Sequence, residues 1–143
     1  MNDRQDGKYL ETALQEAFSK VKHSLFQWRR LYDSFSAQGK ALPAQPADFF
    51  VCCAGTPYHI EAKTTKDSRL KMFTQYGLMK RWDSVGVTGL VVVHFYTPDR
   101  LFVVPVRELP QQPSWVMRPE WEIRNIQEFI TMILEGSVWS YQK

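Results

Sequence analysis

Three residues that together could bind a metal and act on a phosphate lie in the middle of the chain. The segment Ile60-Glu61-Ala62-Lys63 has the composition of a β-strand and follows a predicted turn. Because side chains alternate along a strand, Glu61 and Lys63 are expected on one face, with the two apolar residues on the other. Asp48 starts the preceding predicted strand and could reach the same face. Two converging carboxylates repel each other unless a cation lies between them.

Magnesium suits this arrangement, because it prefers oxygen ligands and often binds one or two carboxylates together with a substrate phosphate. Such a metal would lower the pKa of a bound water and neutralise charge on the phosphate. Lys63 would orient the attacking hydroxide or stabilise the developing charge. The pattern therefore predicts phosphodiester hydrolysis. The alternative for an isolated Glu-x-Lys triplet is a weak, exposed ion pair.

Hydrophobic spacing predicts the elements that must position these residues. Helices are expected over 8–36, in one piece or two, over 69–82, and over 123–135 with Gly136 as the stop. Strands are expected over 47–53, 58–63, 89–96 and 101–106, whereas 37–46 and the proline-rich 110–119 are expected to be irregular. The order α-β-β-α-β-β-α indicates an α/β fold, with a mixed sheet flanked by helices, in one domain over residues 1–143.

A third acid is suggested by the first predicted helix. Leu10, Leu14 and Phe18 recur at helical spacing and gather on one face. Glu11 lies at the edge of that apolar stripe, whereas Glu16 points away from it. Of the two acids, Glu11 is therefore the one expected to reach a site beside the sheet.

Positive charge is concentrated directly after the Glu-Ala-Lys segment. The net charge of the whole chain is only +3, but residues 62–81 carry six basic residues against Asp67 alone. Such a stretch favours a polyanionic partner over a merely solvated face. The residues predicted to contact a DNA backbone are Lys66, Arg69, Lys71, Lys80 and Arg81.

Further basic residues lie in the segment Gln27–Tyr32, where Arg29 and Arg30 are interleaved with aromatic residues. This segment is interpreted either as a nucleic-acid face, with both arginines on phosphates, or as helix packing between Trp28 and Tyr32. His59 is expected to be structural and to lie on the face opposite Glu61. The adjacent Cys52 and Cys53 are expected to be free thiols, since neighbouring strand residues point to opposite faces.

These motifs together resemble the PD-(D/E)xK nuclease superfamily, and most closely Holliday junction resolvases of the RecU type and their phage-encoded relatives. The matching segments are Gly7-Lys8-Tyr9-Leu10-Glu11, Asp48 and Glu61-Ala62-Lys63-Thr64-Thr65-Lys66. A downstream helix motif is matched by Gln75 and Met79, with Thr74 where the family has His. The family's projecting stalk is replaced here by a short loop over 39–46.

The resemblance implies a restriction-endonuclease-like fold and a homodimer that nicks paired strands of a four-way DNA junction with Mg²⁺ or Mn²⁺. It implies that Asp48, Glu61 and the Ala62 carbonyl bind the metal and that Lys63 is catalytic. It also implies that Glu11 completes the site and that Gln75 contacts substrate or positions the lysine.

Two other functions remain open on the sequence: a restriction or repair endonuclease on the same fold, and a non-catalytic DNA-binding subunit. The absence of an apolar run of about 20 residues argues against a membrane span. The polar N-terminus argues against a signal peptide. The protein is therefore expected in the cytoplasm of a bacterial or phage-infected cell, close to the nucleoid.

Overall fold

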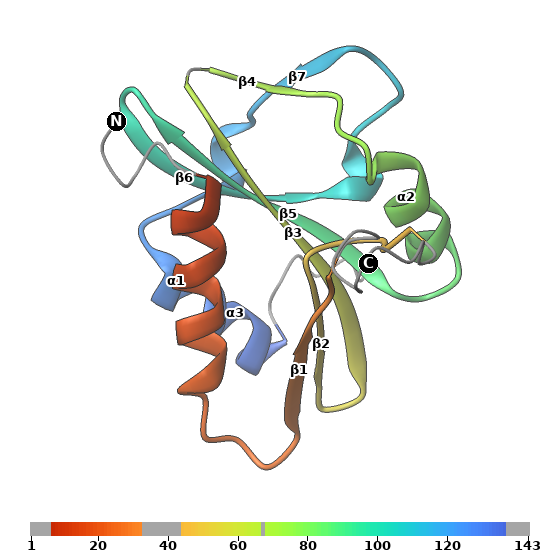
Figure 1. The fold of residues 1–143 in the computed structure, drawn as a ribbon, viewed down its shortest axis with the longest axis vertical. Coiled ribbons are helices and arrows are strands. Elements are labelled where there is room, and N and C mark those ends of the chain that lie inside the picture. The colour runs from red at the N-terminus through yellow and green to blue at the C-terminus, as the bar shows by residue number, and fades with distance from the viewer. Residues whose placement is uncertain (1–6, 33–43, 67, 137–143) are drawn as a thin grey trace.

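The computed structural model describes residues 7–32, 44–66 and 68–136, and its centre is a six-stranded mixed sheet (Figure 1). The strand order is β1-β2-β3-β5-β6-β8, in which β3 and β5 are parallel and the other neighbours are antiparallel. The strands are β1 (Phe26–Arg30), β2 (Phe49–Cys53), β3 (Thr56–Thr65), β5 (Thr88–Tyr96), β6 (Asp99–Pro105) and β8 (Glu122–Ile123).

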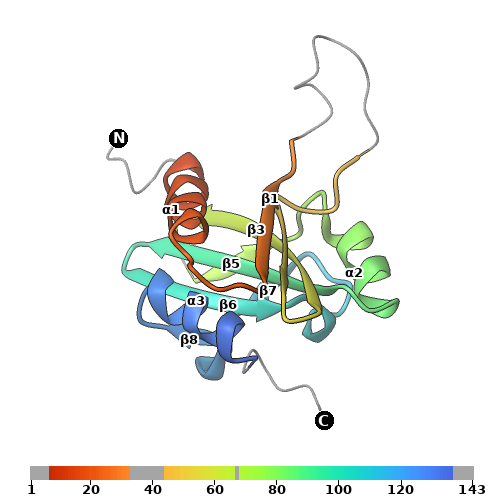
Figure 2. The same ribbon diagram turned by 90° about the horizontal axis from the view of Figure 1, so that it is seen from below.

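Helices cover both faces of this sheet. Helices α1 (Gly7–Ser19) and α3 (Ile126–Glu135) pack on one face through a cluster that includes Leu14, Ile60 and Phe129. Helix α2 (Tyr76–Ser84) lies on the other face, together with a small sheet of β4 (Arg69–Lys71) and β7 (Ser114–Val116) (Figure 2). Two single-turn helices, η2 (Val106–Glu108) and η3 (Pro119–Trp121), complete the described elements. The predicted mixed sheet flanked by helices is thus confirmed.

The helix predicted over 8–36 is wrong beyond Ser19, because residues 26–30 form β1. Trp28 points from this strand toward α1, where its ring lies 5.9 Å from that of Phe18 and 6.3 Å from that of Phe49. Trp28 and Tyr32 therefore do not pack as neighbours on a helix. Leu25, which lies just before this strand, is 61% exposed. The segment forms a strand rather than a helix because pairing with β2 buries alternate residues, which a helix would not do. Residues 33–43 lie outside the described residues.

The helix predicted over 69–82 is correct only in its second half. Residues 69–71 form β4, which pairs with β7 inside the segment expected to be irregular. Leu70 is buried opposite Trp115 while its two neighbours are exposed, so tertiary pairing overrides local helical spacing.

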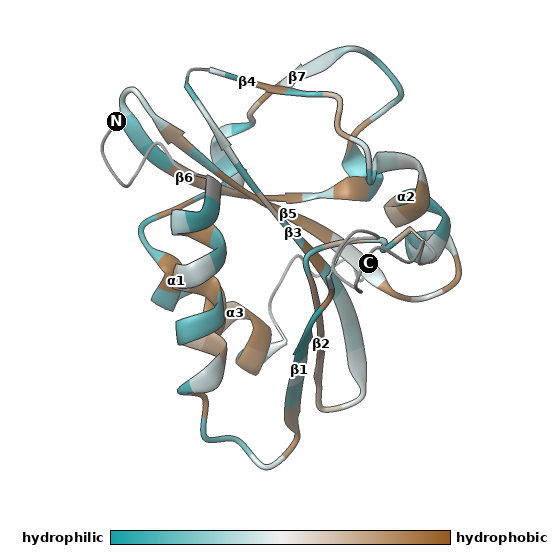
Figure 3. Ribbon diagram, in the orientation of Figure 1, coloured by the Kyte–Doolittle hydropathy of each residue, from teal (hydrophilic) through white to brown (hydrophobic). Residues whose placement is uncertain are grey.

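The other predicted elements are found with shifted ends. Strand β5 is buried along most of its length, as its apolar run predicts, because both hydrophobic clusters use its side chains. Helix α3 starts three residues later than predicted, where the Asn125 side chain accepts a hydrogen bond from the Glu128 amide at 2.9 Å. It ends at Gly136, which has the left-handed φ of 67° that favours glycine. Figure 3 shows the alternation of polar and apolar residues along α1.

The β2–β3 hairpin carries the two cysteines and turns at Ala54 and Gly55, which both have positive φ. Cys53 is buried and Cys52 is partly exposed, and both are free thiols, as predicted. In the part of the chain that the structure describes, every helix is too short or too polar to cross a membrane.

The packing of α2 against the sheet depends on Gly89 in β5. A Cβ atom at this position would lie 2.6 Å from Cγ1 of Val106 and 3.3 Å from the Met79 side chain of α2. Valine is branched and stiff, so it cannot move aside without repacking. Gly89 therefore lets α2 and the η2 turn approach the sheet closely.

We expect Gly89→Ala to lower the free energy of unfolding by about 1–3 kcal/mol, because it overpacks this contact. Gly77 in α2 is the matched control, since a Cβ there would meet nothing within 4 Å. Gly77→Ala should be neutral or stabilising by up to about 1 kcal/mol, because alanine favours a helix. Urea unfolding of both variants measures the difference, and equal stabilities would contradict this account of the α2 packing.

Candidate active site

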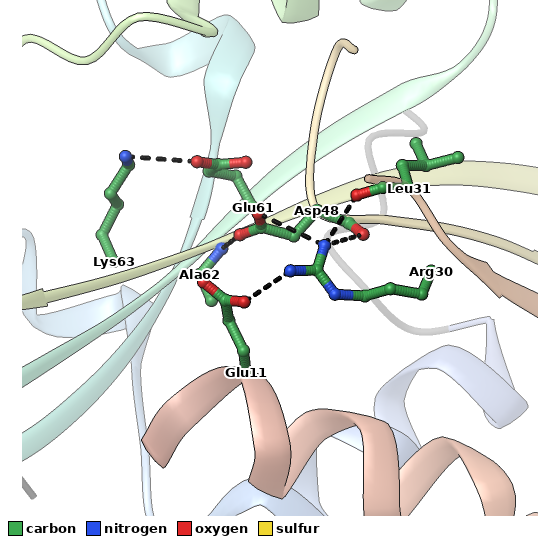
Figure 4. Close-up of polar contacts among 7 residues, drawn as sticks. All are labelled: Glu11, Arg30, Leu31, Asp48, Glu61, Ala62 and Lys63. Atoms are coloured by element: carbon green, nitrogen blue, oxygen red, sulfur yellow. Dashed lines mark hydrogen bonds and ion pairs between the residues drawn. The ribbon is translucent and has the colours of Figure 1, made fainter. Parts of the chain in front are cut away.

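The two predicted carboxylates lie close together where strand β2 begins beside β3. The antiparallel pairing of β2 with β3 ends at Phe49 and Ile60, so Asp48 lies just beyond the last pair, next to Glu61. The Asp48 amide donates to the Ile60 carbonyl at 3.1 Å, and the Ala62 amide donates to Oδ2 of Asp48 at 2.8 Å. The Asp48 carboxylate therefore lies against β3 at the point where β2 begins, close enough to Glu61 to raise the pKa of that acid (Figure 4).

Glu61 is a deeply buried acid, with only 3% of its surface exposed. Its Oε2 lies 3.2 Å from Nζ of Lys63, but its Oε1 is buried without a hydrogen-bond partner among the described residues. Burial and then the negative charge of Asp48 raise the pKa of Glu61 to about 8, although Lys63 opposes this rise. A buried carboxylate oxygen with no donor is costly, and a bound cation would satisfy it.

Lys63 follows Glu61 on the same face, as strand alternation predicts. Its ammonium group lies 5.5 Å from the centre of the Phe73 ring, and its side chain is about one-third exposed. The lysine is thus held beside the buried acid while it still reaches solvent, where a substrate phosphate would lie.

Arg30 links Glu11 of α1 to Asp48 through hydrogen bonds. Its Nη2 lies 2.6 Å from Oε1 of Glu11, and its Nη1 donates to the carbonyls of Leu31 at 2.7 Å and Asp48 at 2.8 Å (Figure 4). The same nitrogen lies 3.6 Å from Oδ1 of Asp48. The guanidinium is engaged within the protein, so the predicted role of Arg30 in binding DNA phosphate is not supported by its contacts. Sequence reasoning missed this role, because it placed Arg30 on a helix.

The structure brings Glu11 to this cluster from the first turns of α1. The pKa of Glu11 is raised, first by burial and then by Asp48, while Arg30 and Lys63 oppose the shift. Glu11 is thus part of the same electrostatic system as Asp48, although Arg30 lies between them.

A cavity of about 700 Å³ opens beside these groups. Its wall contains Asp48, Glu11 and Gln75, the residue that directly precedes α2. Oε1 of Gln75 is buried without a partner among the described residues. Lys8, Arg30 and Arg81 also line the cavity, so three basic side chains share its wall with the acids Glu11 and Asp48. The arrangement can accommodate an anionic group next to the two acids.

Of the other residues predicted to contact DNA, four are simply exposed, and two are hydrogen-bonded within the described part of the protein. Arg29, Lys66, Lys71 and Arg81 are exposed. Arg69 donates to Oγ of Ser114 at 2.7 Å, and Nζ of Lys80 donates to the Leu109 carbonyl at 3.0 Å. The last two therefore have structural partners, which the sequence pattern did not reveal.

His59 was predicted to lie on the face opposite Glu61, and this is wrong, because residues two apart on a strand share a face. Its ring lies 5.6 Å from both the Phe50 and the Trp82 rings. Burial lowers the pKa of His59 to about 4, so the ring is neutral near pH 7. The expected structural role agrees with this packing.

Within residues 7–32, 44–66 and 68–136, no group of three or more His, Cys, Asp or Glu side chains is arranged to hold a metal ion. A divalent metal would therefore depend on Asp48 and Glu61, with main-chain oxygen and water completing its shell. That donor set fits Mg²⁺ or Mn²⁺, which take few protein carboxylates. The unpartnered Oε1 of Glu61 supplies a free ligand atom at the expected position.

No family model and no curated protein matches this sequence. Among solved structures, the fold is similar to that of Archaeoglobus fulgidus Hjc, a Holliday junction resolvase from an archaeal hyperthermophile. The TM-score is 0.57 and the sequence identity 16%, and the match covers 85% of this chain and 98% of Hjc. The likeness concerns the fold, and it confirms the predicted restriction-endonuclease-like architecture with a central mixed sheet flanked by helices.

Because the pKa of Glu61 is raised, the free energy of unfolding is expected to depend on pH. A carboxyl group whose pKa is higher in the folded state favours folding at low pH, and this contribution is lost as the pH rises from 4.5 to about 8. Without metal, we expect Glu61→Gln to be more stable than the wild type near pH 8 by about 2–3 kcal/mol, and much less so near pH 5. Urea unfolding in EDTA at both pH values measures this. A stability difference that does not change with pH would show that the Glu61 carboxyl is not strained by its surroundings.

Proposed function

We propose that the protein is a divalent-metal-dependent, structure-selective DNA endonuclease, and most specifically a Holliday junction resolvase of the RecU or phage-encoded kind. The observation that carries the proposal is the buried Glu61, which lies close to Asp48 and beside Lys63 and has one oxygen without a hydrogen-bond partner among the described residues. The fold shared with a Holliday junction resolvase supports it. We assign residues 1–143 to one nuclease domain.

In this proposal Asp48, Glu61 and the Ala62 carbonyl hold Mg²⁺ or Mn²⁺. When bound, the cation supplies activation of water and neutralisation of phosphate charge. Lys63 places its ammonium group beside the scissile phosphate and stabilises the charge that develops there. Arg30 fixes Asp48 and Glu11 in position, and Gln75 contacts the substrate from the cavity wall. The reaction is hydrolysis, so the leaving sugar oxygen takes up a proton and no covalent enzyme intermediate forms.

The exposed basic residues provide the contacts to the DNA backbone. Lys66, Lys71 and Arg81 follow the Glu-Ala-Lys strand along the chain and lie at the surface. Arg69 and Lys80 retain partial roles, because their hydrogen bonds to the protein leave other donors available. Paired nicks on a four-way junction require two active sites, so we propose that a homodimer is the active form.

A restriction or repair endonuclease on the same fold is the alternative enzyme, because a fold does not fix a substrate. The third function, a non-catalytic DNA-binding subunit, is disfavoured by the acids. Clustered carboxylates repel phosphate unless metal is present, and a module that only binds DNA gains nothing from burying Glu61.

Metal binding gives a test that does not require a substrate. We expect millimolar Mn²⁺ or Mg²⁺ to raise the melting temperature of the wild type, because a ligand that binds the folded state stabilises it. Asp48→Asn and Glu61→Gln should lose most of this increase, whereas Glu16→Gln, an exposed acid on α1, should keep it. An equal metal effect in all four proteins would contradict the assigned ligands.

Cleavage tests the reaction and its substrate together. With Mg²⁺, the wild type should introduce paired nicks in a synthetic four-way junction and leave a linear duplex of the same sequence intact. Lys63→Ala should slow cleavage by about 100- to 1,000-fold, because it removes a stabiliser of transition-state charge. Lys20→Ala, which removes an exposed lysine just after α1, is the control and should cleave like the wild type.

The alternative outcomes separate the three functions. Cleavage of both substrates would keep the nuclease and remove junction selectivity. Binding of DNA without cleavage of either substrate, over a range of divalent metals, would favour the non-catalytic subunit.

A further inference from the structure

The face of the sheet that carries Glu61 continues past the acids into a row of aromatic and basic side chains. The register pairs Arg29 of β1 with Phe50 of β2, and Phe50 with His59 of β3. Cross-strand partners point to the same face, so these three form one row across the sheet. His59 is two residues from Glu61 along β3, which places the row about 6.6 Å from the row of the acids.

Helix α2 extends this row with a tryptophan. The Trp82 ring lies 5.6 Å from the His59 ring at an interplanar angle of 85°, and the Phe50 ring lies at the same distance from His59. His59 is buried, whereas Trp82 is 43% exposed and Phe50 is partly exposed. The buried imidazole thus contacts two aromatic rings that both reach the surface.

The charge on this surface suits a polyanion. Arg29 is exposed at one end of the row, and Arg81, which precedes Trp82 in α2, is exposed and lines the cavity beside Asp48. The next row toward the hairpin turn contains Gln27, Cys52 and Pro57, which are neutral. Asp83, the acid nearest in sequence to Trp82, is engaged by the Gly89 amide at 3.0 Å and by Arg107 at 3.2 Å.

A row of exposed aromatic rings between arginines matches the chemistry of unpaired nucleotides. Bases stack on aromatic side chains whatever their sequence, and arginine binds the phosphates between them. Bases inside a duplex have both faces covered by their neighbours, so they cannot use such a surface without first unstacking. A stacking surface next to the acids would therefore favour DNA in which bases are already open at a branch point.

We propose that this aromatic row, composed of Arg29, Phe50, His59 and Trp82, binds unpaired nucleotides next to the scissile phosphate. A base stacks on Trp82 and Phe50, and Arg29 binds the adjoining phosphate. This inference rests on the proposed nuclease function, because it accounts for selectivity toward branched DNA at the same site.

The test measures binding in EDTA, so that it does not depend on cleavage. The probe is a short single-stranded oligonucleotide, labelled for fluorescence anisotropy, beside a duplex of the same sequence. Trp82→Leu removes the aromatic face but keeps apolar bulk, and it should weaken single-strand binding by about 5- to 150-fold while duplex binding changes little. Trp82→Phe should retain most of the affinity.

The matched control is Tyr9→Ala, which removes an aromatic residue of similar exposure, 40%, from α1 on the opposite side of the sheet. This variant should bind the single strand like the wild type. Arg29→Gln should reduce the dependence of log affinity on log salt concentration by about 0.7, the value for one phosphate contact on a single strand. Unchanged melting temperatures verify that the variants are folded.

The outcomes distinguish this inference from the proposed function. If the wild type cleaves junctions and Trp82→Leu binds the single strand as tightly as the wild type, the aromatic row is not the binding surface and the nuclease stands. If Trp82→Leu loses single-strand binding and the wild type cleaves no DNA, the row binds nucleotides and the nuclease is wrong. Equal losses of single-strand and duplex affinity would also overturn the inference, because stacking on open bases would not be the cause.

Discussion

The pairing of two carboxylates on adjacent strands is the constraint on which the rest of the site depends. Ile60 and Ala62 are held in the core between the sheet and α1, so alternation forces Glu61 toward the other face and below the surface. Asp48, just before β2, accepts the Ala62 amide through its side chain and so lies close to Glu61. Burying two such acids together is unfavourable, and the neighbouring groups compensate for it only in part.

Different groups partly offset the cost of burying each acid. Lys63 meets one oxygen of Glu61, and the Ala62 amide and Arg30 meet the carboxyl group and carbonyl of Asp48. One oxygen of Glu61 is left without a donor among the described residues. A divalent cation at this oxygen would supply the missing partner. Catalytic sites commonly keep such local strain, and the surrounding fold maintains it.

The local parts of this site could be predicted from the sequence. The shared face of Glu61 and Lys63 follows from strand alternation, and the inward position of Glu11 follows from helical spacing. The hairpin that brings Asp48 to them follows from two short strand-like segments around a turn. Each of these inferences uses residues that are close together in the chain, where the periodicity of side chains decides the geometry.

The parts that could not be predicted depend on distant pairing. The segment before Arg30 has apolar spacing compatible with a helix, and only β2, about 20 residues later, turns it into a strand. Leu70 and Trp115 are likewise brought together by β4 and β7. The wrong prediction for His59 has a different cause, because strand alternation alone would have placed His59 on the same face as Glu61. The contacts of Arg69 and Lys80 with Ser114 and Leu109 were also hidden, because their partners lie far along the chain.

The strand conformation of β1 also decides how two adjacent arginines are used. On a helix, Arg29 and Arg30 would point in directions about 100° apart and could both approach one polyanion. On a strand they point to opposite faces. Arg30 therefore turns toward α1, where it joins Glu11 to Asp48, while Arg29 turns toward the face that carries Glu61 and Trp82. The edge strand β1 thus places Arg30 beside the acids on one face of the sheet. It places Arg29 on the other face, where the proposed substrate would bind. In the proposed nuclease, substrate binding by Arg29 and support of the acids by Arg30 would be coupled through the pairing of β1 with β2, rather than through any contact between the two arginines.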